Sequence, residues 1–505
     1  MLARRSASLA RTPPLLFAAK NQCRCNYSSR PNHTAFRTAT ALPPPRIDYR
    51  GIVENVVKKS NNALNRKASL PTGAIDDVAR MYTEFKRLTN TLNAKRNARS
   101  VVGERIRKSA GEGDLEAKNT ALTEAAQLKL EVSELEAILA QVEHQLLTLA
   151  LAIPNDTHPD SPLGPESSAI TVSTHGPEPL PSNPERDHVA ICRKFGLLDL
   201  ESGSTVTGSS WYYLLNEAAL LEIALTNYAI SVALKHGFTP VVTPDVVRSD
   251  IASRCGFQPR DDSDPPMAQM YHINTPPASP ELVLSGTSEI PLAGMFANKV
   301  FPSTTLPLKV VGVGHAFRAE AGARGADTRG LYRVHQFTKV ELFAVTTAEG
   351  SESMVKDILN VQKTIIGSLG FPFRVLNMPT EELGASAYQK YDIEGWMPGR
   401  GNWGELSSLS NCTDYQARRL HIRYRLQHPN TSSGEEATPA TTSTALPFAH
   451  TLNGTAAAIP RLIVALLENG AIYNEQGELT GIHLPAVLKP FWIGPENARG
   501  FTHWS

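Results

Sequence analysis

The strongest constraint on the fold lies between residues 75 and 150, where apolar residues recur every three or four positions. In the second half of this stretch the series is Leu128, Val132, Leu135, Leu139, Val142, Leu146 and Leu149. Such steps keep one side of a helix apolar, as in a coiled coil. The first half keeps the same rhythm from Val78 to Leu92. The segment SAGEGD, Ser109 to Asp114, lies between the two, so we expect an antiparallel helical hairpin with this segment as its turn.

The two predicted helices carry opposite charges. From Lys86 to Lys108 there are eight basic residues against Glu104 alone, whereas the second helix carries six Glu residues. A charged helix face is usually a solvated surface. However, the chain after residue 47 has a net charge of −7, so a charge of +7 within 23 residues is concentrated. Contacts with the phosphates of an RNA would use such a helix, and both interpretations stay open.

The first 47 residues contain eight Arg and Lys residues, many Ser, Ala and Thr residues, and no acidic residue. This composition is typical of a mitochondrial transit peptide, and the alternative is a tail without a targeting role. We predict a transit peptide over residues 1–47 and a location in the mitochondrial matrix. No apolar run approaches the roughly 20 residues of a membrane helix. The most apolar helical stretch, Leu214 to Leu234, contains Glu217 and Glu222 and is predicted to be a core or amphipathic helix.

Composition divides the rest of the chain. Residues 48–154 hold the predicted hairpin, and residues 155–186, rich in Pro, Ser, Gly and Thr, are predicted to be a linker. One large domain is expected over residues 187–494, followed by a tail over 495–505, and residues 429–447 resemble a low-complexity surface insertion. Cys192, Cys255 and Cys412 are widely spaced, which predicts reduced cysteines without a disulfide or zinc site.

The residues with the most chemistry lie on two predicted strands, Lys309 to Glu320 and Val334 to Phe343. Side chains two apart share a face of a strand, so Arg318 and Glu320 are expected to point the same way. On the second strand one face would carry Arg333, His335, Phe337, Lys339 and Glu341. Exposed sheet faces are often polar, and a solvated face with incidental charges is the simpler alternative.

Three other segments supply complementary groups. Thr287 and Glu289 are two apart, and Glu405 and Ser408 lie in a polar stretch. Asn453, Thr455 and Arg461 lie where a predicted polar turn leads into an apolar helix. Together these segments offer carboxylates for an ammonium group, an oxygen pair for a divalent cation and arginines for phosphate. The P-loop pattern G-x-x-x-x-G-K-[ST] is absent from the Gly-rich loop, and no Ser/His/Asp arrangement is evident.

In this order the segments resemble the seryl-tRNA synthetase family. FRAEAG with TRGLYRVHQFTKVE is similar to the family's second class II motif, HTLNGTAAAIPR to the third, and GFTPVVTPDVV to the first, which builds the dimer interface. YDIEGWMPG and LNAKRNARS are also similar to family segments. The resemblance covers about residues 50–490. It implies an α+β fold, in which a class II catalytic domain with an antiparallel sheet flanked by helices follows an N-terminal antiparallel helical hairpin, the coiled-coil arm.

The resemblance also implies roles for individual residues. Arg318 and Arg461 would be catalytic. The serine-binding residues would be Thr287, Ser288, Glu289, Arg318, Glu341, Asn453 and Thr455. The ATP-binding residues would be Arg318, Ala319, Glu320, Val334, Phe337, Glu405, Leu406, Ser407, Ser408 and Arg461. Glu405 and Ser408 would hold Mg²⁺, and Arg96 and Arg99 on the arm would bind tRNA.

The implied activity is that of a serine–tRNA ligase, with serine, ATP and tRNA(Ser) as partners, a homodimeric assembly and no membrane. Attack of a carboxylate on an α-phosphate needs positioning and neutralised charge, which Arg and Mg²⁺ supply without a side-chain nucleophile. The family commonly has Gly where this chain has Ala456 and Pro460, and Pro460 is expected in the first helical turn.

Two alternatives use the same motifs. A relative that activates an amino acid for a carrier protein should lack the arm, which this chain keeps. A non-catalytic RNA-binding relative should have lost Arg318, Glu320 or Arg461, and all three remain.

Overall fold

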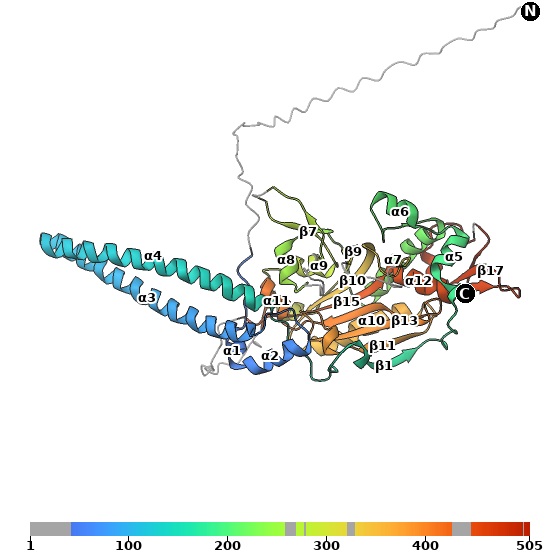
Figure 1. Cartoon of the computed structure of the whole chain (residues 1–505), viewed down its shortest axis with the longest axis horizontal. Helices are drawn as coiled ribbons and strands as arrows, with labels where there is room; N and C mark the ends of the chain where they lie inside the picture. The colour runs from blue at the N-terminus through green and yellow to red at the C-terminus, as the bar shows by residue number, and fades with distance from the viewer. Residues whose placement is uncertain (1–41, 258–268, 277–278, 321–328, 427–445, 498) are drawn as a thin grey trace, which may run out of the picture. The chain divides into compact units, whose positions relative to one another are not determined.

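The computed structural model describes residues 42–257, 269–276, 279–320, 329–426, 446–497 and 499–505 (Figure 1). Residues 42–505 form one compact unit. The predicted transit peptide up to residue 41, most of the Gly-rich loop after Glu320, and nearly all of the predicted insertion at 429–447 lie outside the described residues.

The predicted helical hairpin is confirmed as α3 (Ala74–Glu112) and α4 (Leu115–Ala152), which lie side by side in Figure 1. The turn is shorter than predicted, because α3 continues through Ser109 to Glu112. Only Gly113 and Asp114 connect the helices. Gly113 has φ +74°, a left-handed conformation that costs glycine little. The Asp114 side chain then accepts a hydrogen bond from the Ala117 N–H and caps α4.

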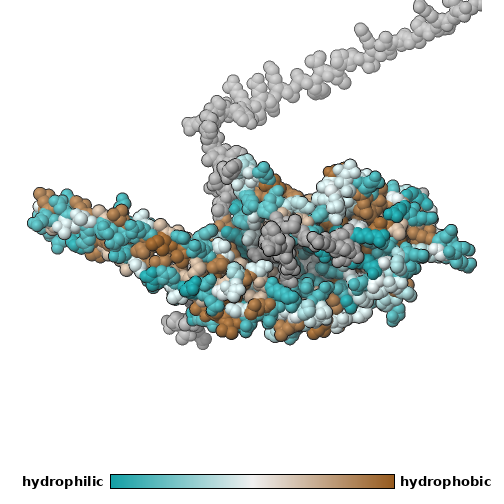
Figure 2. Space-filling view, in the orientation of Figure 1, coloured by the Kyte–Doolittle hydropathy of each residue, from teal (hydrophilic) through white to brown (hydrophobic). Residues whose placement is uncertain are grey.

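The heptad seam of α4 faces α3 as predicted. Leu128, Val132 and Leu146 are buried, and the other seam residues are partly buried. Three basic residues of α3 form ion pairs with α4, with nitrogen–oxygen distances of 2.7 Å for Lys95–Glu131, 2.7 Å for Arg96–Glu136 and 2.9 Å for Arg105–Glu124. Figure 2 shows apolar patches among the hydrophilic residues of the arm, and α4 exposes Leu115, Leu122, Leu130 and Ile138.

The base of the arm is joined to the rest of the unit by a buried arginine. Helices α1 (Tyr49–Glu54) and α2 (Val56–Asn65) share an apolar cluster with α3 and α4. After α2, Arg66 donates from Nη1 to the Asn155 carbonyl at 2.8 Å and from Nη2 to the Gly384 carbonyl. The arm base is therefore held by the backbone of the domain that follows it.

Residues Leu42 to Arg46, here called the N-terminal strap, lie against the folded unit. The Pro43 carbonyl accepts from Arg254 Nη1 and the Pro44 carbonyl from His421 Nε2, both at 2.8 Å. The Arg46 N–H donates to a carbonyl of the same surface, and Leu42 packs on an apolar cluster. These contacts favour a transit peptide that ends before Leu42, and the boundary at residue 47 stays a prediction. Composition could not show this, because the strap lacks acidic residues, as do the residues before it.

The domain that follows the arm is built on one large sheet. Among the described residues, eight strands follow the order β1-β11-β12-β13-β15-β10-β9-β4. All neighbours are antiparallel except β4 and β9. Their bounds are β1 Ile170–His175, β11 Phe373–Asn377, β12 Gln389–Met397, β13 Asn402–Asn411, β15 His450–Ala458, β10 Gln336–Thr346, β9 Leu308–Phe317 and β4 Thr239–Val242. The predicted α+β class with an antiparallel-dominated sheet is confirmed.

Helices cover both faces of this sheet. On the first face lie α5 (His188–Phe195), α7 (Asn216–Lys235), α10 (Ser351–Gly367) and α12 (Ile459–Gly470), packed in the largest apolar cluster. On the second face lie the short helices α8 (Ser249–Arg254), α9 (Glu289–Met295) and α11 (Tyr415–Leu420). Strand β10 shows the division, because Val340 and Leu342 belong to the first cluster whereas Phe343 and Val345 belong to the second. The polar residues of the predicted site share the second face.

Two predicted boundaries are wrong. The predicted linker at 155–186 contains β1, whose Ile170 pairs with Asn377 at the edge of the main sheet. The segment ITVSTH is rich in β-branched residues, but the surrounding Pro and Ser obscured that signal. The predicted tail at 495–505 contains β18 (Thr502–Trp504), which pairs in parallel with β17 (Leu479–Leu484).

The remaining elements are short. The strands are β2 Leu198–Asp199, β3 Tyr213–Leu214, β5 Val246–Arg248, β6 His272–Ile273, β7 Leu282–Leu284, β8 Val300–Pro302, β14 Arg423–Arg425 and β16 Ala471–Tyr473. The helical turns are α6 Leu200–Val206, η1 Glu166–Ser168, η2 Pro184–Arg186, η3 Ser303–Thr305, η5 Thr380–Glu382 and η6 Ala486–Phe491.

One described helix, α7, is long and apolar enough to cross a membrane by length and composition alone. Its buried residues, among them Leu221, Leu225 and Tyr228, lie in the core as predicted. Cys192, Cys255 and Cys412 are free and buried, and burial raises the pKa of Cys192 to about 12. As predicted for structural cysteines, all three lie in the core of the part of the chain that the structure describes.

Candidate active site

The hairpin of β9 and β10 carries the first half of the site. Strand β9 is shorter than predicted, because it ends at Phe317, and Arg318 and Glu320 follow it, whereas β10 begins at Gln336 and continues to Thr346. The Arg318 N–H donates to the His335 carbonyl and His335 Nδ1 donates to the Arg318 carbonyl, each at 2.9 Å, which continues the hairpin by one pair. Glu320 has φ +47°. Arg318 and Glu320 line the same cavity, but regular strand alternation is not the reason.

A β-bulge in β13 and another in β15 determine which side chains of these strands point into the cavity. On β13, Ser407 pairs with Ile393 and Glu405 with Glu394, so Leu406 is an extra residue. Leu406 and Ser407 therefore both face α10, and Glu405 and Ser408, three apart, both face the cavity. A regular strand would have put them on opposite faces.

Strand β15 repeats this device. Val340 pairs with Ala457 and Glu341 with Thr455, so Ala456 is the extra residue. Ala456 and Ala457 face the core, while Thr455 and Ala458 line the cavity. The predicted polar turn before Arg461 is therefore a bulged strand. Pro460 lies at the first turn of α12, as predicted.

The cavity opens where β13 and β15 separate. Their pairing runs from Asn411–Leu452 to Leu409–Gly454 and then stops. Beyond that point the buried Gln362 of α10 contacts both strands, with its Nε2 2.8 Å from the Ser408 carbonyl oxygen and 3.1 Å from that of Thr455. The side chain thus satisfies carbonyls that the separated strands leave without a ladder partner.

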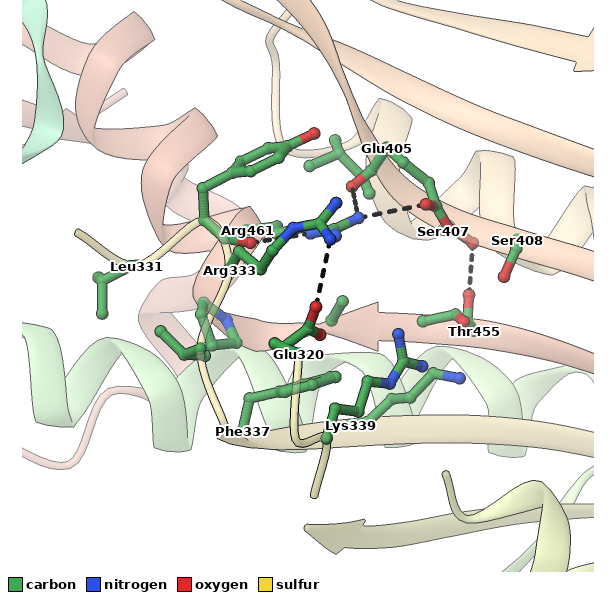
Figure 3. Close-up of a pocket in the computed structure, with 16 residues that line it drawn as sticks. Glu320, Leu331, Arg333, Phe337, Lys339, Glu405, Ser407, Ser408, Thr455 and Arg461 are labelled. Carbon is green, nitrogen blue, oxygen red and sulfur yellow. Dashed lines mark hydrogen bonds and ion pairs between the residues drawn. The ribbon is translucent and has the colours of Figure 1, made fainter. Parts of the chain in front are cut away.

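One half of the cavity is lined by basic, acidic and aromatic residues (Figure 3). Figure 3 places Phe337 and Arg461 on opposite sides of it, with Glu320 and Arg333 between them. Arg333 Nη1 donates to Glu320 Oε2 at 3.2 Å. The guanidinium of Arg318 lies over the Phe337 ring, 5.4 Å from its centroid. A flat ring between cations suits a nucleotide base and its phosphates.

Arg461 and Glu405 form the charged centre of this half. Arg461 Nη1 donates to the Glu405 carbonyl at 2.9 Å and lies 3.3 Å from Glu405 Oε2. Burial acts to raise the pKa of Glu405, but Lys390, Arg461 and Arg318 together lower it to about 2. Burial likewise acts to lower the pKa of Arg461, and Glu405 reverses this, so that the pKa is raised. Both groups are therefore charged throughout the physiological range.

The other half of the cavity is centred on Lys339. Its Nζ lies 2.5 Å from Glu341 Oε2 and donates to Thr287 Oγ1 at 3.1 Å. Glu289 accepts a hydrogen bond from Gln416 of α11. Burial, helped by the nearby Glu341, raises the pKa of Glu289 to about 7. Carboxylates are thus concentrated around one ammonium group, and a second ammonium could bind there.

Glu341 and Thr455 occupy opposed positions on β10 and β15 and both are buried. Asn453, on the same face of β15, donates to Cys412 Sγ at 3.5 Å and lines the cavity. A carboxylate and a hydroxyl that face each other in a buried position can hydrogen-bond a small hydroxyl group.

Most predicted site residues are brought together, with a few exceptions. Thr287, Glu289, Arg318, Glu320, Val334, Phe337, Glu405, Leu406, Ser407, Ser408, Asn453, Thr455 and Arg461 line the two adjoining halves of the cavity. The Ser288 hydroxyl instead lies against Thr243, and the Ala319 N–H donates to the Gln269 carbonyl. Glu341 is buried and paired with Lys339, and it is not one of the residues that line the two halves. Arg96 and Arg99 are on the arm.

Several residues of the cavity had no predicted role. Lys339 lies on the predicted polar face of its strand, so the alternation of that strand could have identified it as a site residue. Tyr332, whose carbonyl accepts from Arg461 Nε at 3.2 Å, gave none, and neither did Gln416. Lys390 pairs with Asp392 at 2.7 Å beneath Glu405. The effect of Lys390 on the pKa of Glu405 depends on the register of β12 against β13, because these two residues lie on different strands.

The oxygens of Glu405 and Ser408 suit a magnesium ion. Mg²⁺ prefers hard oxygen ligands and is usually held by one or two carboxylates together with substrate phosphates and waters. The low pKa of Glu405 keeps its carboxylate ionised. Among the described residues no group of three His, Cys, Asp or Glu side chains could hold a metal alone. The donor set therefore fits an ion shared with a phosphate ligand.

Comparison with known proteins gives consistent matches over most of the chain. Residues 47–157 match the model of the seryl-tRNA synthetase N-terminal domain, and residues 271–470 match that of the tRNA synthetase class II core domain (G, H, P, S and T). The chain is 40% identical over 447 residues to the mitochondrial serine–tRNA ligase of Schizosaccharomyces pombe, covering 88% of each chain. It is 37% identical to the mitochondrial serine–tRNA ligase of Saccharomyces cerevisiae, covering 90% of this chain and 96% of the other.

The fold is also similar to a solved structure. The crystal structure of seryl-tRNA synthetase from Pyrococcus horikoshii complexed with ATP superposes with a TM-score of 0.74 at 31% identity, covering 88% of this chain and 98% of that one.

Proposed function

This chain belongs to the seryl-tRNA synthetase family and has the family's serine–tRNA ligase activity, and from that premise we propose how its residues divide the reaction. Serine binds in the half of the cavity around Lys339, and ATP binds in the half between Phe337 and Arg461. Arg318 lies where the two halves meet, because it lines both.

The serine end recognises three groups of its substrate. Glu289 and Thr287 receive the ammonium group. Arg318 receives the carboxylate and brings it to the α-phosphate. Glu341 and Thr455, with Asn453 beside them, hydrogen-bond the hydroxyl, which is supported by their opposed positions on β10 and β15. A pocket built for a hydroxyl rejects analogues without one by about 10⁴-fold.

The ATP end holds the base and the phosphates separately. Adenine stacks on Phe337 at the face where Arg318 now lies, Glu320 accepts from the adenine amino group, and the backbone at Val334 lies along the base. Arg461 stacks on the other face of the base and reaches the γ-phosphate. Glu405 and Ser408 would hold Mg²⁺, which supplies neutralisation of phosphate charge when bound.

The first step is attack of the serine carboxylate oxygen on the α-phosphorus. A phosphorus–oxygen bond forms to give seryl-adenylate, and the bond to the β-phosphate oxygen breaks, so pyrophosphate leaves with that electron pair. Arg318 and Arg461 stabilise the charge as it shifts. In the second step a terminal ribose hydroxyl of tRNA attacks the seryl carbonyl, and AMP leaves.

For the tRNA, we propose contacts along the basic helix α3. Arg99 is exposed and makes no ion pair among the described residues, whereas Arg96 is paired with Glu136. Arg99 is therefore the stronger candidate for a phosphate contact.

A homodimer and a matrix location complete the proposal. Strand β4 is at one end of the sheet, and its Val242 is 90% exposed. Leu234 of α7 and Val246 of β5 are exposed nearby in sequence. Apolar residues at a sheet edge favour association with a second copy. The mitochondrial relatives and the basic N-terminus support import into the matrix. We propose no membrane contact for α7, because its buried residues pack in the core.

The cavity that joins Arg318 to both halves is the observation that carries this proposal. Serine-dependent exchange between ATP and pyrophosphate tests it, with threonine, alanine and cysteine as comparisons. Exchange with serine alone is expected. A folded dimer that gives no exchange would contradict the assignment and favour an RNA-binding relative.

A further inference from the structure

A buried acid–imidazole pair lies behind the ATP half of the cavity. His188, the first residue of α5, and Glu468, in the last turn of α12, are both buried. His188 Nδ1 is 3.0 Å from Glu468 Oε1. The other carboxylate oxygen accepts the Gly399 N–H at 2.8 Å and the Arg400 N–H at 3.3 Å. Glu468 is thus satisfied by hydrogen bonds inside the protein.

The remaining nitrogen of His188 reaches the chain that lines the cavity. The Leu331 N–H donates to His188 Nε2 at 3.2 Å. Because Nε2 accepts, the proton of a neutral imidazole is on Nδ1, which donates to Glu468. Gly330, at φ +67°, permits this approach, since a Cβ there would be 2.2 Å from His188 Nε2.

The segment Leu331 to Val334 is the wall of the ATP half. Arg461 holds it from the same helix, because Arg461 Nε donates to the Tyr332 carbonyl at 3.2 Å and its guanidinium lies 4.7 Å from the centre of the Tyr332 ring. Arg461 and Glu468 are seven residues apart on α12, two turns along one face. The wall is therefore tied to α12 at Tyr332 directly and at Leu331 through His188.

From this arrangement we propose that His188 and Glu468 are positioning residues for ATP. They keep Leu331 to Val334 in register with Arg461, so that the backbone at Val334 and the guanidinium meet the nucleotide together. Neither residue lines the serine half of the cavity. Their loss should therefore weaken ATP binding and leave serine binding unchanged. The proposal rests on the ATP placement proposed above.

The test is steady-state ATP–pyrophosphate exchange on the full chain, with the KM for ATP and the KM for serine measured separately. His188→Leu keeps the volume and removes both hydrogen bonds. We expect it to raise the KM for ATP about tenfold or more, because buried groups lose their partners, with the KM for serine changed less than twofold. Glu468→Gln should also raise the KM for ATP, because the new amide NH₂ would face an N–H donor, either His188 Nδ1 or the Gly399 backbone.

Two further variants separate positioning from packing. His188→Gln offers one donor and one acceptor, so it should restore most of the ATP affinity. Tyr228→Phe removes a partly buried hydrogen bond to Ser368 on the first face of the sheet and should change neither KM. For a variant too slow to assay, calorimetry with ATP alone gives the dissociation constant.

Parallel increases in both KM values, or no change in either, would overturn the positioning role. Gly330→Ala provides a second route, because its Cβ would displace His188 Nε2 and crowd Val189, and it should reproduce the selective loss. Wild-type exchange with serine is measured first. Its absence would refute the proposed function itself, whereas wild-type exchange without the selective shift would refute only this inference.

Discussion

Arg461 Nη1 donates to the backbone carbonyl of Glu405 at 2.9 Å and lies 3.3 Å from its carboxylate. The arginine proposed for the γ-phosphate is thus paired with the carboxylate proposed for the metal. Phosphates that enter would compete with Glu405 for Arg461, and a cation would compete with Arg461 for Glu405. The pair keeps both charges compensated before ATP binds.

Replacing Glu405 by Gln should raise the Mg²⁺ concentration needed for half-maximal exchange by at least about tenfold. The carboxylate, whose pKa is about 2, is ionised at every pH at which the enzyme works, so the variant loses a full charge. The measurement is a magnesium titration at saturating ATP and serine. Glu352→Gln, an exposed residue of α10, is the control and should leave the titration unchanged. Identical titrations for Glu405→Gln and wild type would remove Glu405 from the metal site.

Serine capture should weaken as the solution becomes acidic. Burial raises the pKa of Glu289 to about 7, so below that pH the residue becomes neutral and loses its attraction for an ammonium group. The value of kcat/KM for serine should fall toward a tenfold loss per pH unit below about 7, because this ratio reports the free enzyme. Glu289→Gln should be slow at all pH values and lose this dependence. A pH profile that Glu289→Gln leaves intact would show that another group causes it.

Discrimination against alanine should depend on the opposed pair of Glu341 and Thr455. Thr455→Val and Glu341→Gln are each expected to reduce the ratio of kcat/KM for serine over alanine by about 10 to 100-fold, because the hydroxyl loses a buried partner. Exchange rates with the two amino acids give the ratio. Thr338→Val is the control: it lies on β10 but bonds Glu222 on the other face, so its ratio should equal that of wild type.

Arg99 should contribute one phosphate contact to tRNA binding. Arg99→Ala is expected to raise the KM for tRNA and to lower the slope of log affinity against log salt by about one. Arg96→Ala should change the slope less, because Arg96 is already paired with Glu136. Serine-dependent exchange, which needs no tRNA, should be unchanged in both. If neutralising both arginines leaves the KM for tRNA unaltered, the arm is not the tRNA contact proposed here.

The N-terminal strap should belong to the mature enzyme. A chain that begins at Asp48 loses the hydrogen bonds of Pro43, Pro44 and Arg46 and should melt at least about 2 °C below a chain that begins at Leu42. Mass spectrometry of the enzyme from mitochondria should accordingly place the first residue at or before Leu42. Equal melting temperatures, or a mature chain that starts after Ile47, would show that the strap is dispensable.

The spacing of apolar residues along the sequence was enough to predict much of the fold. The heptads of α3 and α4 and the alternation on β10 were readable because burial on one side of a helix or strand determines the residue type at each step. The alternation also placed Phe337, Lys339 and Glu341 on one face, as the structure has them.

What could not be predicted depends on partners distant in the chain. The extra residues Leu406 and Ala456 are bulges only relative to β12 and β10. Gln362 is a long way in sequence from the carbonyls that it satisfies. Likewise, the pairing of β1 with β11 is invisible within a Pro-rich segment.

The two bulges make the length of the chain part of the chemistry. Deleting Leu406 would restore regular alternation on β13 and turn Glu405 toward the core, although every charged and polar residue proposed for the site would remain. A relative with such a deletion would keep all its motifs and be an inactive enzyme. The spacing of three residues, rather than two, from Glu405 to Ser408 and from Thr455 to Ala458 therefore distinguishes active members of the family from inactive ones.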